Sequence, residues 1–386
     1  MMRRRTFLGG GAAALGAAGA AGYWFGLRPL AVPQPAPVGF TLTAEEDSAA
    51  RALMRRFPVI DAHAHPGRTF LRDAEGMSRL LRLYRLIGGT FEDESIADMT
   101  QGGLAAAVFN GVGDVQVITL AGGGLTPYRA FAPDEAWESY RRQIANLRGL
   151  ADSGRVRLCL TPDDVLAAHA QGIPGAILAM EGADALNGDP ARVAQLYADG
   201  VRMLTLVHYT DNDLGPTMTS GTGGGLSDAG RAVVAAMNDA GMMIDLAHAA
   251  EPLALDVVAA TRKPVILSHT HINTPALTNP RFVSPELAQA VAQTGGYIGA
   301  WPAGIGIDSL DGFADRVVGL IEVMGEDHVA LGSDMDANYR PVLETYRKMP
   351  LLVGALMRRG LGDDTLEKVL GGNVLRLWRT VQATGT

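Results

Sequence analysis

The 386-residue sequence has one cysteine, no excess of basic residues and no phosphate-binding glycine motif. The lone Cys159 excludes an internal disulfide framework and any zinc site built from several thiolates. Lys and Arg number 33 against 41 Asp and Glu, a formal net charge of −8, so no basic surface for nucleic acid is indicated. No Gly-x-Gly-x-x-Gly follows a predicted strand, which argues against a dinucleotide site. Hydrophobic residues nevertheless make up 47% of the chain, enough for a large buried core.

The first 30 residues have the layout of a targeting segment. Arginines 3 to 5 precede Thr6-Phe-Leu and an apolar run rich in glycine and alanine. This pattern resembles the twin-arginine export signal, so we expect an exported protein of the periplasm or cell envelope. The apolar run is close to the ~20 residues that span a bilayer, which leaves retention as an N-terminal membrane anchor open.

A proline-rich linker separates this segment from one folded domain. Prolines at positions 33, 35 and 37 predict a stiff, extended linker over residues 31–40. Thr43 and Glu46 have the spacing of a helix capping box at the start of the domain, which we expect to cover residues 41–386.

Short apolar runs alternate with helical patterns through this domain. The predicted strands cover residues 58–63, 105–110 (with an extension through 115–120), 176–181, 201–208, 242–248, 264–269, 297–301 and 328–334. Helical patterns lie between most of them, at 133–153, 190–199, 228–240, 252–260, 285–293 and 312–324. Continuous apolar strands that alternate with helices indicate a parallel sheet covered on both faces, and eight such units favour a closed (β/α)8 TIM barrel.

Histidines and acidic residues collect at the ends of these predicted strands. They are His63, His65, Glu181, His208, His248, His269 and Asp334, and His271 follows closely. In a parallel barrel the carboxyl ends of the strands meet at one rim, where catalytic groups lie. Taken singly, each histidine could be a buried core residue and each acid a loop or capping residue. Their joint placement on one rim predicts a metal centre.

The ligand set contains imidazole and carboxylate but no thiolate, which suits zinc, or else manganese or iron. Five or six ligands exceed the needs of one tetrahedral ion, and a glutamate can bridge two. Two ions a few Å apart could hold a shared hydroxide as nucleophile and polarise a scissile carbonyl.

The same residues lie in motifs that resemble the membrane dipeptidase (renal dipeptidase) family of the metal-dependent amidohydrolase superfamily. The motifs run in order from VIDAHAHP at 59–66, through AMEGADAL at 179–186, MIDLAHA at 243–249 and PVILSHTH at 264–271, to LGSDMDA at 331–337 and GGNVLRLW at 371–378. The resemblance implies a dipeptidase with two zinc ions, and it favours a homodimer.

The resemblance also implies a role for each residue. His63 and His65 would bind one zinc ion, His248 and His269 the other, and Glu181 would bridge both. His208 would contact the substrate carbonyl and stabilise the tetrahedral intermediate, and Asp334 would pass a proton to the leaving amine. Arg281 would bind the free carboxylate of the substrate; a solvated loop arginine is the alternative.

One position departs from the family pattern. The family usually has His-x-Asp at the first strand, whereas this chain has His63-Ala-His65. A neutral ligand at position 65 leaves the centre one charge unit more positive, which changes metal preference more than metal binding.

The predicted function is therefore hydrolysis of dipeptides, with D-residues accepted on the C-terminal side. The first alternative is another binuclear amidohydrolase activity: a lactonase, a deacylase or a phosphoester hydrolase. The second is a metal-stabilised envelope protein without catalysis. The expected partners are the substrate, the membrane through the N-terminus and a second copy of the chain, and nucleic acid is not expected.

Overall fold

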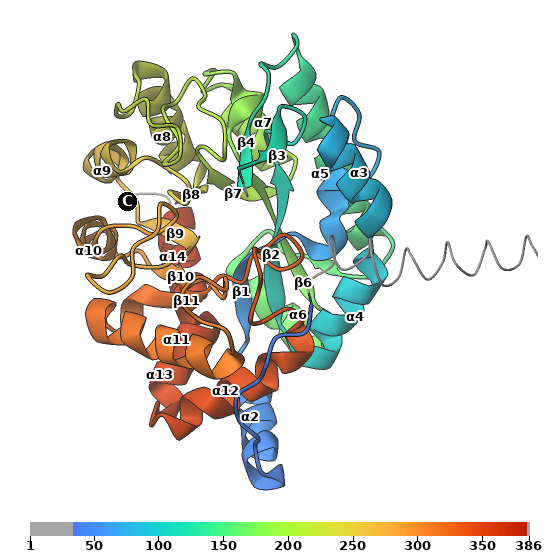
Figure 1. Ribbon diagram of the computed structural model, residues 1–386, viewed down its shortest axis with the longest axis vertical. Coiled ribbons are helices and arrows are strands. Elements are labelled where there is room, and N and C mark those ends of the chain that lie inside the picture. Colours follow the sequence, from blue (N-terminus) through green and yellow to red (C-terminus); the bar gives the residue numbers. More distant parts are fainter. Residues whose placement is uncertain (1–33, 123, 384–386) are drawn as a thin grey trace, which may run out of the picture.

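The computed structural model describes residues 34–122 and 124–383, which form a closed barrel of eight parallel strands (Figure 1). The ring order is β1, β2, β6, β7, β8, β9, β10 and β11, and β11 pairs with β1 to close it. These strands are β1 (Ile60–Ala64), β2 (Ala106–Val112), β6 (Gly175–Glu181), β7 (Val201–Thr205), β8 (Met243–Asp245), β9 (Val265–Thr270), β10 (Ile298–Ala300) and β11 (Val329–Leu331). Every residue in them is buried, as expected for a parallel sheet covered by helices. The predicted TIM barrel is confirmed.

Helices follow the strands and form the outer ring. They are α2 (Ala44–Arg56), α3 (Arg79–Gly88), α4 (Glu92–Gly102), α5 (Glu135–Asp152), α6 (Pro162–Gln171), α7 (Arg192–Ala198), α8 (Asp228–Ala240), α9 (Glu251–Ala260), α10 (Pro285–Gln293), α11 (Leu310–Met324), α12 (Met349–Arg358), α13 (Asp363–Glu367) and α14 (Asn373–Gln382). The predicted capping box at the start of α2 is confirmed, because Thr43 Oγ1 accepts from Glu46 N and the Glu46 carboxylate accepts from Thr43 N.

The predicted extension of the second strand through residues 115–120 is wrong. β2 ends at Val112, and a turn leads into a separate antiparallel hairpin of β3 (Ile118–Ala121) and β4 (Gly124–Pro127). The alternating pattern of this stretch fits a hairpin whose inner side chains, Val115 and Ile118, pack on the loop after β1 and on α3. A ninth short strand, β5 (Arg157–Leu158), pairs only with the beginning of β6.

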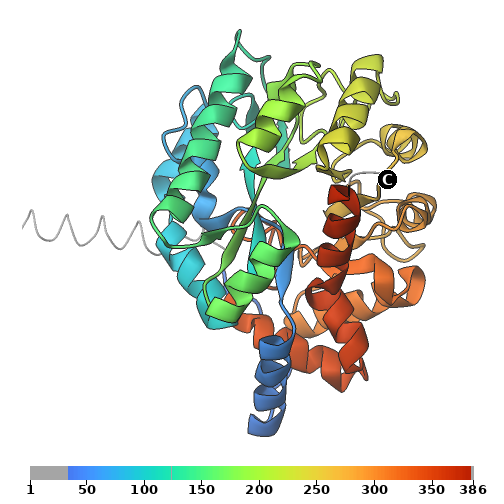
Figure 2. The same cartoon turned by 180° about the vertical axis from the view of Figure 1, so that it is seen from behind.

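The amino-terminal ends of the strands are closed by the last helix. Ile60, Met243 and Tyr297 from the barrel interior form one buried cluster with Trp378 and its neighbours on α14. In the rear view α14, in dark red, runs beside the barrel (Figure 2). Cys159 belongs to this cluster, and burial raises the pKa of its thiol to about 12, as is typical of an unreactive packing residue.

The predicted targeting segment, residues 1–30, and the first three residues of the predicted linker lie outside the described residues. From Gln34 onward the linker can be followed, and the carbonyls of Pro37 and Val38 accept from Leu310 N and Asp311 N at the start of α11. Among the described residues, no helix has the length and apolar character needed to cross a membrane.

Candidate metal centre and active site

Glu181, the last residue of β6, lies at the centre of the histidine cluster and is 2% exposed. Its Oε1 is 2.9 Å from His248 Nε2, 3.4 Å from His63 Nε2 and 3.5 Å from His269 Nε2. Its Oε2 is 3.2 Å from His65 Nε2 and 3.3 Å from His208 Nε2. Burial alone would raise the pKa of Glu181, but the surrounding histidines hold it well below its usual value. The carboxylate is therefore an anion with imidazoles on both of its oxygens.

The imidazole nitrogens form two pairs beside this carboxylate. His63 Nε2 and His65 Nε2 are 3.2 Å apart at the end of β1, and His248 Nε2 and His269 Nε2 are 3.2 Å apart after β8 and in β9. Asp334 joins the first pair, with Oδ1 3.5 Å from His65 Nε2. The candidate cation ligands form three overlapping groups: His63 with His65 and Asp334, His63 with Glu181 and His269, and Glu181 with His208 and His248.

Hydrogen bonds behind the cluster leave the inner nitrogens free to bind a cation. Ser268 Oγ is 2.7 Å from Asp245 Oδ2, which takes the hydroxyl proton. Ser268 Oγ also lies 3.1 Å from His63 Nδ1 and 2.9 Å from His269 Nδ1, so it accepts their N–H groups. A proton on Nδ1 leaves the Nε2 lone pair pointing at Glu181, the tautomer of a metal ligand.

His65 is oriented in the same way, because its Nδ1 donates to the main-chain carbonyl of Asn110 at 3.1 Å. Three of the four histidines that flank Glu181 in pairs are therefore held in the tautomer that metal binding requires. The residues present fit two divalent cations.

His208 differs from these four because its Nδ1 faces a carboxylate. Asp114 Oδ1 lies 2.7 Å from His208 Nδ1, and Asp114 Oδ2 accepts from the main-chain N–H groups of Tyr209 and Thr210. Burial works to lower the pKa of His208, but Asp114 and Glu181 outweigh it and raise the pKa to about 9. His208 is thus a charged donor whose Nε2 points into the cluster.

Asp184 lies behind this pair. Thr210 Oγ1 is within hydrogen-bond distance of both acids, 3.2 Å from Asp114 Oδ2 and 3.3 Å from Asp184 Oδ1. Burial and the charge of Asp114 raise the pKa of Asp184 to about 7. Asp184 is thereby kept largely protonated below neutral pH, while Asp114 bears the charge that pairs with His208.

Arg281 reaches the cluster from the loop between β9 and α10. Its Nη2 is 2.9 Å from His248 Nε2 and 3.1 Å from His269 Nε2, and its guanidinium carbon lies 5.1 Å from the centre of the Trp301 ring. The side chain is 9% exposed and forms no ion pair with any carboxylate among residues 34–122 and 124–383. A buried guanidinium without an acidic partner is suited to an anionic group of a ligand.

The backbone is strained where two of these residues lie. His248 has φ 65° and Asp334 has φ 53°, in the left-handed region that side chains other than glycine rarely adopt. Buried carboxylates hold the adjoining chain: Asp61 accepts from His63 N and Ser333 N, and Asp245 accepts from Ala247 N and Ser268 N. Strain of this kind is typical of functional sites, where packing holds side chains in fixed directions.

The structure brings all eight predicted site residues to the same rim of the barrel. Sequence reasoning missed the groups that orient them: Asn110, Asp114, Ser268, Asp245 and Trp301. His271, the additional histidine considered from the sequence, stacks its ring edge-on against Phe282, and its Nδ1 has no partner among the described residues. Burial lowers the pKa of His271 to about 4, so it is a neutral packing residue.

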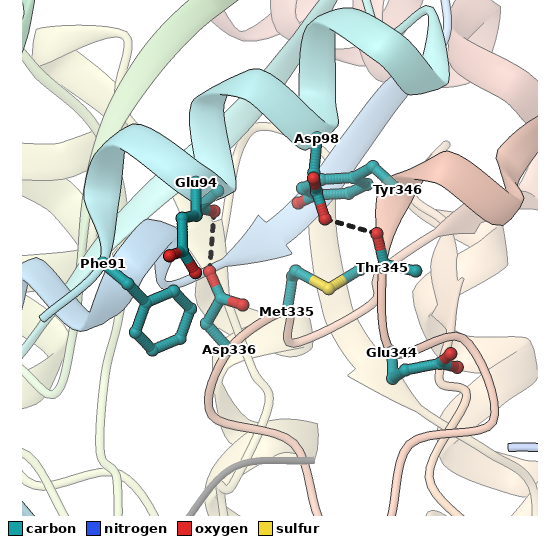
Figure 3. A pocket seen from close by; sticks show the side chains of 9 residues that line it. Phe91, Glu94, Asp98, Met335, Asp336, Glu344, Thr345 and Tyr346 are labelled. Carbon is teal, nitrogen blue, oxygen red and sulfur yellow. Dashed lines mark hydrogen bonds between the residues drawn. The ribbon is translucent and has the colours of Figure 1, made fainter. Parts of the chain in front are cut away.

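A separate small pocket opens between α4 and the loop after β11 (Figure 3). It is lined by four acidic residues, and three of them have partners of their own. Asp336 accepts from Gly67 N and Ser95 Oγ, Asp98 pairs with Arg347, and Glu344 pairs with Lys348. The pocket therefore carries no evident site, and Asp336 instead ties the loop after β11 to the loop after β1.

Two comparisons of sequence point to one family. Residues 47–386 match the family model described as membrane dipeptidase, peptidase family M19. Dipeptidase verJ of Clonostachys rogersoniana is 30% identical over 266 residues, which cover 65% of this chain and 68% of that protein. An uncharacterised dipeptidase of Schizosaccharomyces pombe is 32% identical over 235 residues, 57% of this chain and 56% of that one. The chain thus spans little more than half of the latter relative.

Solved structures share the fold over most of the chain. A metallopeptidase named dipeptidase AC has a TM-score of 0.70 and 24% identity, with 85% of this chain and 99% of that one covered. A metallopeptidase from Rhodobacter sphaeroides, liganded with a phosphinate mimic of the dipeptide L-Ala-D-Ala, has a TM-score of 0.68 and 23% identity, with 84% and 99% covered. The fold, the clustered cation-binding side chains and the match over residues 47–386 agree: the chain belongs to the membrane dipeptidase family and is an enzyme of the metallo-dipeptidase class.

Proposed function

We propose that the chain hydrolyses the amide bond of dipeptides with free termini, in a reaction that depends on two zinc ions. The observation that carries the proposal is Glu181, a buried anion whose carboxylate oxygens lie within 3.5 Å of the Nε2 atoms of all four of the histidines His63, His65, His248 and His269. His63 and His65 would hold one ion, His248 and His269 the other, and Glu181 both. When bound, the ions supply Lewis acidity, which lowers the pKa of water toward neutral and polarises the scissile carbonyl.

Two other residues of the cluster would stabilise the developing negative charge and transfer the proton. His208, charged and fixed by Asp114, donates from Nε2 to the oxygen on which negative charge develops. Asp334 takes a proton from the attacking water and returns it to the departing amine. Burial raises the pKa of Asp334 to about 6, close to a working pH near neutrality, as an acid–base group requires.

Arg281 would bind the free carboxylate of the substrate. With a cation bound, the Nε2 atoms of His248 and His269 would no longer accept from Arg281 Nη2, and the guanidinium would be left for an anionic partner. The L-Ala-D-Ala mimic in the R. sphaeroides metallopeptidase supports an extension of the proposal to dipeptides with a D-residue on the C-terminal side.

The first experiment measures metal content of the purified protein together with hydrolysis of L,L- and L,D-dipeptides and of their C-terminal amides. We expect about two equivalents of zinc, chelator-sensitive cleavage, and a strong preference for the free carboxylate. If two metal ions are bound but no dipeptide is cleaved, another amidohydrolase activity becomes the better proposal. If no metal is bound, the proposal is contradicted.

The Arg281→Ala variant tests the carboxylate contact. A charge-assisted hydrogen bond contributes about 1.5–3 kcal/mol, so kcat/KM for free dipeptides should fall roughly 10- to 100-fold while dipeptide amides are cleaved as by the natural enzyme. Arg281→Lys keeps the charge but loses the planar guanidinium, so its kcat/KM for free dipeptides should lie between those of the natural enzyme and Arg281→Ala. Unchanged selectivity in Arg281→Ala would favour a substrate without a carboxylate.

We also propose that the protein is exported to the periplasm or cell envelope through residues 1–30. The support is the sequence Arg4-Arg5-Thr6-Phe-Leu before an apolar run. The variant Arg4→Lys with Arg5→Lys should leave the protein in the cytoplasmic fraction of a bacterial host, whereas the natural sequence is found in the envelope or periplasm. Equal distribution of both proteins would exclude the twin-arginine route.

A further inference from the structure

Helix α3 carries an unusual exposed face. Leu80 is 45% exposed, Leu83 is 47% exposed and Leu86 is 79% exposed, although α3 has only 10 residues. Spaced by three, these leucines lie along one side of about two helical turns. Leu81, on the side turned away from this surface, is buried, and the partly buried Tyr84 packs beside it.

Arginines alternate with the leucines on the same face. Arg79 and Arg82 are exposed and form no ion pair with any residue of the described part of the chain. Residues 72–88 contain four arginines and two acidic residues, in a chain whose net charge is −8. The face is therefore apolar and basic together.

The hairpin beside α3 extends the apolar part of this surface. β3 packs against α3, its Leu120 is 41% exposed, and Tyr128 directly after β4 is 50% exposed. Residues 115–131 contain no acidic residue, and their arginine, Arg129, pairs with Glu135. Because α3 lies in the segment after β1 and the hairpin follows β2, both belong to the rim of the barrel that carries the cluster around Glu181.

We propose that this α3 surface, made of Arg79, Leu80, Arg82, Leu83 and Leu86, docks on a membrane rich in anionic phospholipid. A helix with interleaved leucines and arginines lies in the interface, with its leucines among the acyl chains and its arginines at the phosphates. A second copy fits less well, because a two-fold axis through α3 sets its arginines against the same arginines. Docking would hold the mouth of the barrel close to the lipid surface.

Hydrogen exchange on the full chain tests the docking directly. With vesicles that contain phosphatidylglycerol, the amides of residues 79–88 should exchange several-fold more slowly, and with phosphatidylcholine vesicles they should not. The readout is confined to α3, so attachment through another segment does not by itself produce it. Equal protection by both lipids, or none by either, would overturn the proposal.

Matched variants separate the two components of the surface. Each arginine near an anionic surface contributes about 1 kcal/mol, so Arg79→Gln with Arg82→Gln should raise the lipid concentration for half-maximal protection roughly thirtyfold. Leu83→Glu with Leu86→Glu should abolish the protection, and dipeptide cleavage in solution should stay unchanged. Val323→Glu on α11, where the side chain is 53% exposed, is the control and should behave as the natural chain.

Protection of α3 that grows with protein concentration in the absence of vesicles would assign this face to a second copy and refute the lipid proposal. Loss of dipeptide cleavage in the leucine variants would likewise contradict it, because it would show that α3 supports the site itself.

Discussion

Replacing Glu181 with glutamine is expected to abolish most of the catalytic activity together with metal binding. The amide keeps the size of the side chain but removes a carboxylate that lies within 3.5 Å of five histidine nitrogens. Loss of a residue that only hydrogen-bonds to a metal ligand lowers metal affinity or activity by about 10- to 100-fold. Loss of a ligand shared by two ions should therefore lower kcat/KM by more than about 100-fold. Metal content, measured on the same preparation, should fall in parallel.

Thermal unfolding gives a second readout for Glu181→Gln. A ligand that binds only the folded protein stabilises it, so a chelator should lower the Tm of the natural enzyme and leave that of Glu181→Gln almost unchanged. Glu94→Gln is the matched control, since Glu94 lines the pocket of Figure 3 and lies outside the cluster. A Glu181→Gln enzyme with full metal content and activity would mean that the carboxylate only balances histidine charge.

The barrel could be predicted because each of its strands is a continuous apolar run between helical patterns. All eight predicted strands lie over observed ones, and this agreement follows from burial on both faces of a parallel sheet. The error at residues 115–120 has the same origin. A short hairpin that packs one side on α3 has an apolar pattern that cannot be told from the end of a longer strand, and only the turn after Val112 decides between them.

The candidate site could be predicted only in part, because the closed barrel brings together residues that lie far apart in the sequence. Ligand-type residues at strand ends are visible in sequence, because the rim gathers them whatever their separation along the chain. The groups that orient them are ordinary residues until the barrel closes. Asp114 lies 94 residues before His208, and Ser268 lies 205 residues after His63, yet each pair is in hydrogen-bond contact. The sequence DLAH, with a buried Asp245 three residues before His248, was the one local signal available.

Replacing Asp334 with asparagine should lower kcat by about 10²- to 10⁴-fold, the range of a single acid–base group. Asparagine fits the same space but cannot take a proton from water and return it to the amine. Because Asp334 Oδ1 is 3.5 Å from His65 Nε2, it could serve instead as a cation ligand, and the metal content distinguishes the two roles. We expect two ions per chain to remain and KM to change little. If the variant lost one metal ion as well as its activity, Asp334 would be a metal ligand.

The neighbouring Asp336→Asn provides the comparison for this result. Asp336 Oδ2 accepts from Gly67 N and Ser95 Oγ, so its replacement should lower the Tm and leave kcat within about threefold of the natural value, as expected for a residue that holds a loop in place. The comparison separates catalysis from loop support, because the two acids lie two positions apart on one loop and both have φ above 50°. If Asp334→Asn retained full activity, proton transfer would belong to another group. His208 would then be the remaining candidate, since its raised pKa keeps a proton on it at neutral pH.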